Sequence, residues 1–242
     1  MAKTQAMTLE ALTERLRQTM GEQLTAVVLY GSAARGERVE QRSDFNVLVI
    51  VRALTPAALR ATAATAQEWT ASKNPPPLIL TEAEWKSSAD VFAMEVADIL
   101  DRHRVLFGAL PAEPATVAAP HLRHQLEFEA MGKLLALRQG ILAAGGNAER
   151  ELELLAASRS AVLVLFRTLL RVHGEAAVDG PEEVVRRAAE HAGFDAAPFL
   201  EVVAHVSGSK RIPASHADVV LTAYHAGLER FVAHVDALVH GK

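Results

Sequence analysis

The sequence predicts an N-terminal α/β (α+β) domain with a mixed sheet, followed by an all-α helical bundle. Up to about residue 108, short apolar runs alternate with helical patterns, as in domains that mix strands and helices. From residue 121 onward the chain is rich in Ala, Leu, Glu and Arg, which favours helices throughout. Three prolines and no periodicity mark the stretch between the two parts. We therefore expect one domain over residues 1–108, a linker over 109–120 and a helical domain over 121–242.

The first domain is expected to combine two helices with four strands. Apolar residues at helical spacing predict a helix over residues 8–20, and Pro56 is well placed in the first turn of a second helix over 56–69. Short apolar runs, several of them rich in Val, predict buried strands. These runs cover residues 24–30, 45–51, 78–80 and 92–99.

The second domain is expected to contain five helices. Leu, Val and Phe recur at helical spacing, and breaks that contain glycine or proline separate the segments. A helical bundle follows from this arrangement. The expected helices run approximately over residues 121–143, 149–173, 181–192, 195–206 and 214–239.

Composition and charge narrow the classes of protein. The 242 residues are 50% hydrophobic and 22% charged, which supplies enough apolar material for a buried core. The absence of cysteine excludes disulfides and thiolate zinc sites. A net charge of −4 argues against a surface that binds nucleic acid. The longest apolar-rich stretch, residues 161–170, contains Arg167 and is too short to span a bilayer. We expect a cytoplasmic protein with no membrane partner and no strong nucleic-acid signal, and a homodimer stays open.

A glycine–serine turn between two predicted strands is the most informative stretch. Gly31 and Ser32 follow the strand over residues 24–30, and Asp44 stands at the start of the next strand. Glycine lets the backbone approach an anion closely, and the serine hydroxyl is a further donor for phosphate. Residues two apart on a strand face the same side, so Asp44 and Asn46 are expected to converge. Magnesium prefers carboxylate oxygens and shares them with phosphates. The pattern therefore indicates a site for a nucleoside triphosphate beside a metal ion.

The segment Gly31-Ser32-Ala33-Ala34-Arg35-Gly36, followed by Ser43-Asp44-Phe45-Asn46 and an apolar strand, resembles the nucleotidyltransferase signature of the DNA polymerase β superfamily. It is similar in particular to the minimal and aminoglycoside-type nucleotidyltransferases of bacteria. The signature itself lies within residues 31–51, whereas the layout of a small catalytic domain before a helical domain covers the whole chain.

The resemblance implies an Asp-x-Asp pair on one strand and a third carboxylate from a later strand. Asp44 matches the first aspartate of the pair, and Asn46 stands in the place of the second. Glu95 is the best match for the third carboxylate. Asp98 is the second choice, because it lies on the opposite face of the strand expected over residues 92–99. The resemblance thus implies Mg²⁺ held by Asp44 and Glu95, with Asn46 as a weak ligand.

The same resemblance implies a reaction and its partners. Gly31, Ser32 and Arg35 would hold a nucleoside triphosphate, the Arg35 guanidinium offering a fixed fork to a phosphate oxygen. A nucleoside monophosphate, most simply AMP from ATP, would be transferred to a hydroxyl of a small molecule or of a protein. The sequence does not identify the acceptor.

Asn46 leaves open whether the chain is an active enzyme. An amide oxygen can touch a metal ion, but it carries no charge, and a clamp of two metal ions depends on that charge. Removing one unit charge beside a divalent ion costs on the order of several kcal/mol. Because each ~1.4 kcal/mol is a factor of ten in rate, impaired activity is expected. The alternative is a catalytically degenerate protein that binds a nucleotide or acts as a regulatory or interaction module.

A third hypothesis rests on the helix expected over residues 149–173. Arg167 followed by His173 near its end is similar to the short motif of the HEPN helical domains, some of which are ribonucleases. Arg and His at this spacing are also common by chance. Cations near a helix C-terminus interact favourably with the helix dipole, so a structural role is the stronger interpretation.

Overall fold

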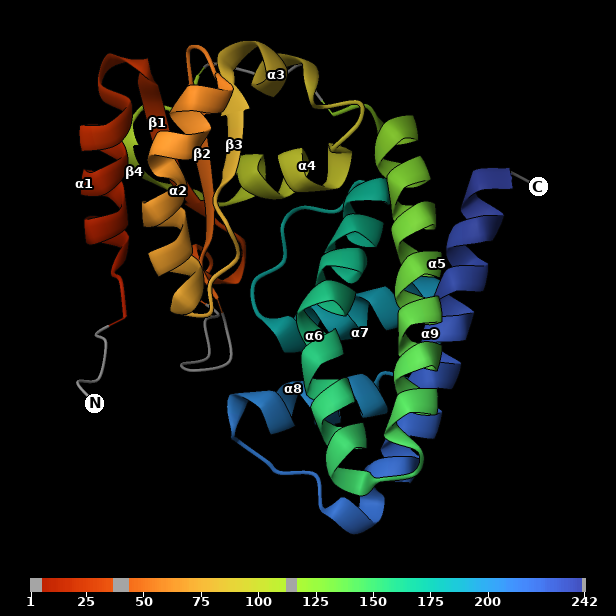
Figure 1. Ribbon diagram of the computed structural model, residues 1–242. Helices are drawn as coiled ribbons and strands as arrows, with labels where there is room; N and C mark the ends of the chain where they lie inside the picture. Colours follow the sequence, from red (N-terminus) through yellow and green to blue (C-terminus); the bar gives the residue numbers. More distant parts are fainter. Residues whose placement is uncertain (1–5, 37–43, 112–116, 241–242) are drawn as a thin grey trace, which may run out of the picture. The chain divides into compact units, whose positions relative to one another are not determined.

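The computed structural model describes residues 6–36, 44–111 and 117–240 (Figure 1). The chain divides into two compact units, Met1–Val117 and Ala118–Lys242. The first unit contains a mixed sheet with helices, and the second contains helices, so the expected fold class is confirmed.

The sheet of the first unit has four strands in the order β3-β2-β1-β4. The central strand β1 pairs in antiparallel fashion with β2 and with β4, whereas β2 and β3 run parallel. Central position and burial on both faces explain why the two central strands are nearly continuous apolar runs. The strands are β1 (Leu24–Tyr30), β2 (Asn46–Val51), β3 (Leu78–Thr81) and β4 (His103–Gly108).

Helices cover both faces of this sheet (Figure 1). Alternate residues of a strand point to opposite faces, so β1 contributes to two cores. On one face Val27 and Leu29 pack with α1 (Leu9–Met20) and α2 (Pro56–Ala71). On the other face Ala26 and Val28 pack with side chains of α4 (Ala93–Asp101) and with Trp85 of α3 (Glu82–Ser87).

Two elements of the first unit differ from the sequence prediction. The strand expected over residues 92–99 is wrong, because these residues form helix α4, and the fourth strand is β4. The buried residues of α4 include Ala93, Val96 and Ile99, which are spaced as one helical face rather than as alternate strand positions. Helix α3 was not expected, although its start carries a capping box between Thr81 and Glu84.

The second unit has one aromatic core surrounded by helices. Phe166 lies at its centre, with ring centroids 5.0 to 5.3 Å from those of Phe194, Phe199 and Phe231. No helix among the described residues combines the length and apolar character that a membrane span requires. The helices are α5 (Ala119–Ala144), α6 (Ala148–Val172), α7 (Pro181–Ala192), α8 (Ala197–Ser207) and α9 (Ala217–His240), close to the five expected.

Candidate functional site

The candidate site lies at one end of the sheet, where β1 ends and β2 begins; we call this end the mouth. Tyr30, the last residue of β1, pairs with Asn46 on one side and with His103 on the other. Residues directly opposite each other on neighbouring strands have side chains on the same face. Tyr30 packs against the core under α3 and α4, so this end of the sheet presents its polar side chains to the face that α4 covers.

Gly31 makes the turn at the mouth possible. Its φ of +74° lies in the left-handed region, which favours glycine. A side chain at this position would also clash, because its Cβ would lie 2.8 Å from the side-chain amide of Asn46. The carbonyl oxygen of Gly31 accepts hydrogen bonds from the backbone nitrogens of Ala34 and Arg35, at 3.1 and 3.2 Å. The turn thus brings Gly31 next to Asn46.

The structure gives this turn one short 3₁₀ helix, Gly31–Ala33. Ser32 is half-buried there. Ser43, the residue of the motif that precedes the aspartate, lies outside the described residues.

Asp44 is exposed and stands two residues before Asn46. Between them, Phe45 packs on the opposite face, its ring 6.1 Å from that of Trp69, and its backbone nitrogen donates to Asn74 Oδ1 at 3.0 Å. Extending the strand alternation by one residue places Asp44 on the same face as Asn46.

Helix α4 brings two further carboxylates to the mouth. Burial, and then the charges of Glu95, Asp98 and Asp44 in that order, raise the pKa of the Tyr30 phenol to about 12. Glu95 and Asp98 of α4, and Asp44 before β2, thus act electrostatically on the same phenol, which directly precedes Gly31.

Two expectations about these carboxylates are corrected by helix α4. Glu95 and Asp98 were expected on opposite faces of a strand, but residues three apart on a helix lie on the same side. The strand that does follow, β4, has the sequence His-Arg-Val-Leu-Phe-Gly and carries no carboxylate. Its residue opposite Tyr30 is His103, whose Nδ1 lies 2.7 Å from the carbonyl oxygen of Ile99. A third carboxylate can thus come only from α4 among the elements described at the mouth.

Arg35 does not offer a solvent-exposed guanidinium. Its Nη2 donates to Oδ1 of Asp98, and the two side chains are only 6% and 9% exposed. The pair joins the end of the glycine–serine turn to helix α4. Asp98 is therefore engaged with Arg35, and Glu95, which is half-buried, is the more accessible of these two carboxylates.

The donors at the mouth suit a magnesium ion that is shared with phosphates. No three His, Asp or Glu side chains among the described residues are grouped as a ready metal cage. Magnesium, however, is commonly bound by one or two carboxylates together with phosphate oxygens. Asp44 and Glu95 are carboxylates of this kind, and Asn46 offers an amide oxygen. The residues present fit the ion in this shared form.

Two residues at the mouth were not singled out from the sequence. Tyr30 directly precedes Gly31, and its position as last residue of the strand was the signal for its place at the site. His103 opens a strand that was not expected, so its pairing with Tyr30 could not be foreseen.

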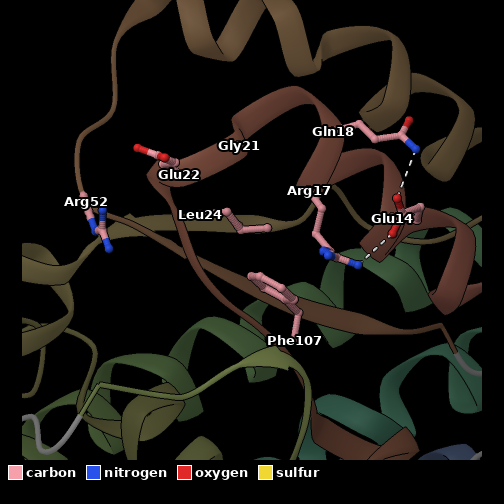
Figure 2. Close-up of a pocket in the computed structure, with 8 residues that line it drawn as sticks. All are labelled: Glu14, Arg17, Gln18, Gly21, Glu22, Leu24, Arg52 and Phe107. Atoms are coloured by element: carbon pink, nitrogen blue, oxygen red, sulfur yellow. Dashed lines mark hydrogen bonds and ion pairs between the residues drawn. The ribbon is translucent and has the colours of Figure 1, made fainter.

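A large hollow lies at the opposite end of the sheet (Figure 2). It has a volume of about 750 Å³, and the guanidinium of Arg17 lies 5.0 Å from the centre of the Phe107 ring at its edge. Arg17 also pairs with Glu14 at 3.0 Å, but both side chains are about half exposed, so the pair is weak. The hollow is lined by Glu14, Arg17, Gln18, Gly21, Glu22, Leu24, Arg52 and Phe107.

The two residues of the ribonuclease hypothesis lie in the second unit, on and just after α6. Arg167 is only 8% exposed. The His173 ring stacks on His191 at 4.1 Å and lies 5.7 Å from His234. Burial and the two neighbouring imidazoles lower the pKa of His173. The imidazole is thus part of a cluster with histidines of α7 and α9, and no observation favours RNA cleavage.

Comparison with known proteins gives one informative result. Neither a protein-family model nor a curated protein matches the chain. The crystal structure of spectinomycin adenyltransferase AAD(9) from Enterococcus faecialis with ATP and spectinomycin is similar, with a TM-score of 0.58 over 91% of this chain and 96% of that chain. The sequences are 13% identical, which shows a shared fold and carries over neither substrate. The chain therefore has the fold of an adenyltransferase, with a polar mouth where the nucleotidyltransferase signature was expected.

Proposed function

We propose that the chain binds a magnesium–nucleoside triphosphate at the mouth and transfers the nucleoside monophosphate to a hydroxyl group. The observation that carries this proposal is the closeness of the Gly31 turn to Asn46 at the start of β2, two residues after Asp44. A carboxylate beside such a turn suits a cation that is shared with a polyphosphate. ATP is the first nucleotide to test, because the adenyltransferase with the shared fold was solved with ATP.

The chain's own residues would have distinct roles. The backbone at Gly31 and the Ser32 hydroxyl contact the phosphates, while Asp44, Glu95 and the amide oxygen of Asn46 hold the ion. Bound magnesium would neutralise the negative charge that develops on the leaving pyrophosphate.

The transfer itself exchanges one phosphorus–oxygen bond for another. The acceptor oxygen forms a bond to the α-phosphorus, the bond from the α-phosphorus to the bridging oxygen breaks, and pyrophosphate leaves with that electron pair. The hydroxyl proton passes to a carboxylate, for which Glu95 or Asp44 is placed. The acceptor is a small molecule or a protein side chain.

The second candidate is a catalytically degenerate nucleotide-binding, regulatory or interaction protein. Two observations favour it: Asn46 carries no charge in the place of the second aspartate, and β4 brings no carboxylate to the mouth. A two-metal clamp would then lack part of its negative charge. On this interpretation the nucleotide binds and is not transferred.

Magnesium-dependent ATP binding and pyrophosphate release, measured for the wild type, Asp44→Ala and Asn46→Asp, distinguish the candidates. Transfer predicts slow pyrophosphate release that Asp44→Ala abolishes. A wild type that binds ATP but releases no pyrophosphate, together with release by Asn46→Asp, supports the degenerate protein. If neither the wild type nor Asn46→Asp binds ATP, both transfer and nucleotide binding are refuted, and the interaction module is left.

A further inference from the structure

We propose that Arg35 is a positioning residue that fastens α4, and with it Glu95, to the glycine–serine turn. This inference rests on the proposed function, and it replaces the expectation that Arg35 itself binds the triphosphate. Its starting point is the pair between Arg35 and Asp98, which are 63 positions apart in the sequence. Their side chains are 6% and 9% exposed, so the contact is buried rather than a surface ion pair.

Because the pair is buried, water does not readily replace either of its members. A buried charge without a partner is strongly unfavourable, so each member of the pair holds the other in place. The exposed pair Arg15–Glu68 offers a contrast. It has a two-pronged contact, at 2.5 and 3.1 Å, yet the side chains are 44% and 43% exposed, so water can replace either member.

Because Asp98 lies on α4, the pair affects where this helix lies at the site. Val96 and Ile99 anchor one side of α4 in the core against β1 and β2. Asp98 fixes the helix at a second point, against the turn. Glu95 lies three residues before Asp98 on the same side of the helix, so both are carried together. A shift of α4 therefore moves Glu95 relative to Gly31.

Because Arg35 contacts Asp98, the triphosphate is bound by other groups. For Arg35 to bind a phosphate, its guanidinium would have to give up the buried contact with Asp98. The phosphates are then contacted by the turn itself, through the Gly31 backbone and the Ser32 hydroxyl. A positioning role and a phosphate-binding role predict different behaviour of the two partners. If Arg35 positions α4, loss of either partner has the same effect. If Arg35 binds phosphate, loss of Asp98 releases the guanidinium and leaves nucleotide affinity unchanged or higher.

The test uses the full chain with Arg35→Gln, Asp98→Asn and the double variant, and Arg15→Gln and Glu68→Gln as controls from the exposed pair. Native-state hydrogen exchange of the α4 amides is the readout that does not depend on activity. We expect exchange in α4 to rise by at least about tenfold in Arg35→Gln and in Asp98→Asn, because each loosens the same helix. The double variant should be no worse than the more affected single variant, and the controls should match the wild type.

The ratio of the effects on kcat and on the KM for ATP is a second measurement, which a purely structural role of Arg35 would not change. Both single variants should lower kcat about tenfold with little change in the KM for ATP, since a small displacement of a carboxylate affects the reaction more than binding. Arg35→Lys, which keeps the charge, should recover part of the loss.

Unchanged exchange in α4, or weaker ATP binding in Arg35→Gln with tighter binding in Asp98→Asn, would overturn the inference. A wild type that binds no nucleotide would refute the proposed function alone, because the exchange experiment still decides whether Arg35 holds α4.

Discussion

The two ends of strand β1 differ in what surrounds them. At the mouth, Tyr30 adjoins a glycine with positive φ, and its pKa is raised by burial and by the charges of carboxylates. At the opposite end, Leu24 borders a hollow of about 750 Å³ whose paired side chains, Glu14 and Arg17, are about half exposed (Figure 2). Water therefore screens the pair that lines the hollow. Perturbed titration in a confined setting marks a candidate site better than volume does.

The largest expected effect comes from removing the carboxylate at the mouth. Asp44→Ala should weaken ATP binding in the presence of magnesium by at least about 100-fold, because it removes a full charge beside the ion. Glu22→Ala, which removes an exposed carboxylate at the opposite end, should change the affinity by less than about twofold. Isothermal titration calorimetry measures both. Equal effects of the two variants would abolish the distinction between the ends.

Replacement of Gly31 or Gly21 by alanine, which adds one methyl group, tests the local geometry at each end. Gly31→Ala should lower the free energy of unfolding by about 2 kcal/mol, through strain at positive φ and contact with the Asn46 amide. Gly21→Ala, at φ +50° with no atom near the added Cβ, should cost about 1 kcal/mol from strain alone. Urea unfolding measures the difference. Asn46→Ala should remove the extra cost of Gly31→Ala, and failure to do so would show that Asn46 does not lie against the turn.

Converting an amide to a carboxylate at each end tests whether the mouth holds a cation. Asn46→Asp should tighten magnesium binding in the presence of ATP by about tenfold, because it adds a charge near the ion. Gln18→Glu makes the same chemical change at the hollow and should have no effect. Weaker ATP binding in Asn46→Asp would mean that the new charge meets phosphates without an intervening cation.

The smallest effect concerns the titration of Tyr30. Its raised pKa means that the associated stability is fully present below the unfolded value of about 10 and is lost as the pH rises through about 12. Asp44→Asn should lower the pKa of Tyr30, because one of the charges that raise it is removed. Glu22→Gln should leave it unchanged.

Phenolate absorbance during a pH titration measures this shift, and Tyr30→Phe assigns the signal against Tyr224. Burial also raises the pKa of Tyr224. An unchanged pKa of Tyr30 in Asp44→Asn would place that carboxylate away from the phenol.

The buried central strands of the fold were readable from the sequence, and the elements outside them were less so. β1 and β2 are apolar runs rich in valine, and such runs have few alternatives to a buried strand. Residues 92–99 are apolar as well, but Ala, Met and Glu favour a helix, and only the spacing of the buried residues separates the two interpretations. β4 begins with His103 and Arg104, and its apolar part is too short to stand out.

The residues of the candidate site also differ in how well the sequence reveals them. Gly31, Ser32 and Asp44 stand out in the sequence because a turn, a hydroxyl and a carboxylate before a strand are local features. The burial of Arg35 against Asp98 could not be predicted, because a contact across 63 positions depends on how α4 packs. Tyr30 gains its role from neighbours on β2, β4 and α4, and none of these is visible in its own segment.

Paramagnetic broadening of backbone amide signals by Mn²⁺ and ATP tests most directly where the nucleotide binds. The two ends of β1 are roughly 20 Å apart, from its seven residues at about 3.3 Å each. Binding at the mouth predicts strong broadening at Gly31, Ser32 and Asn46 and little at Leu24 and Arg52. The reverse pattern, or uniform broadening along the strand, would contradict the account.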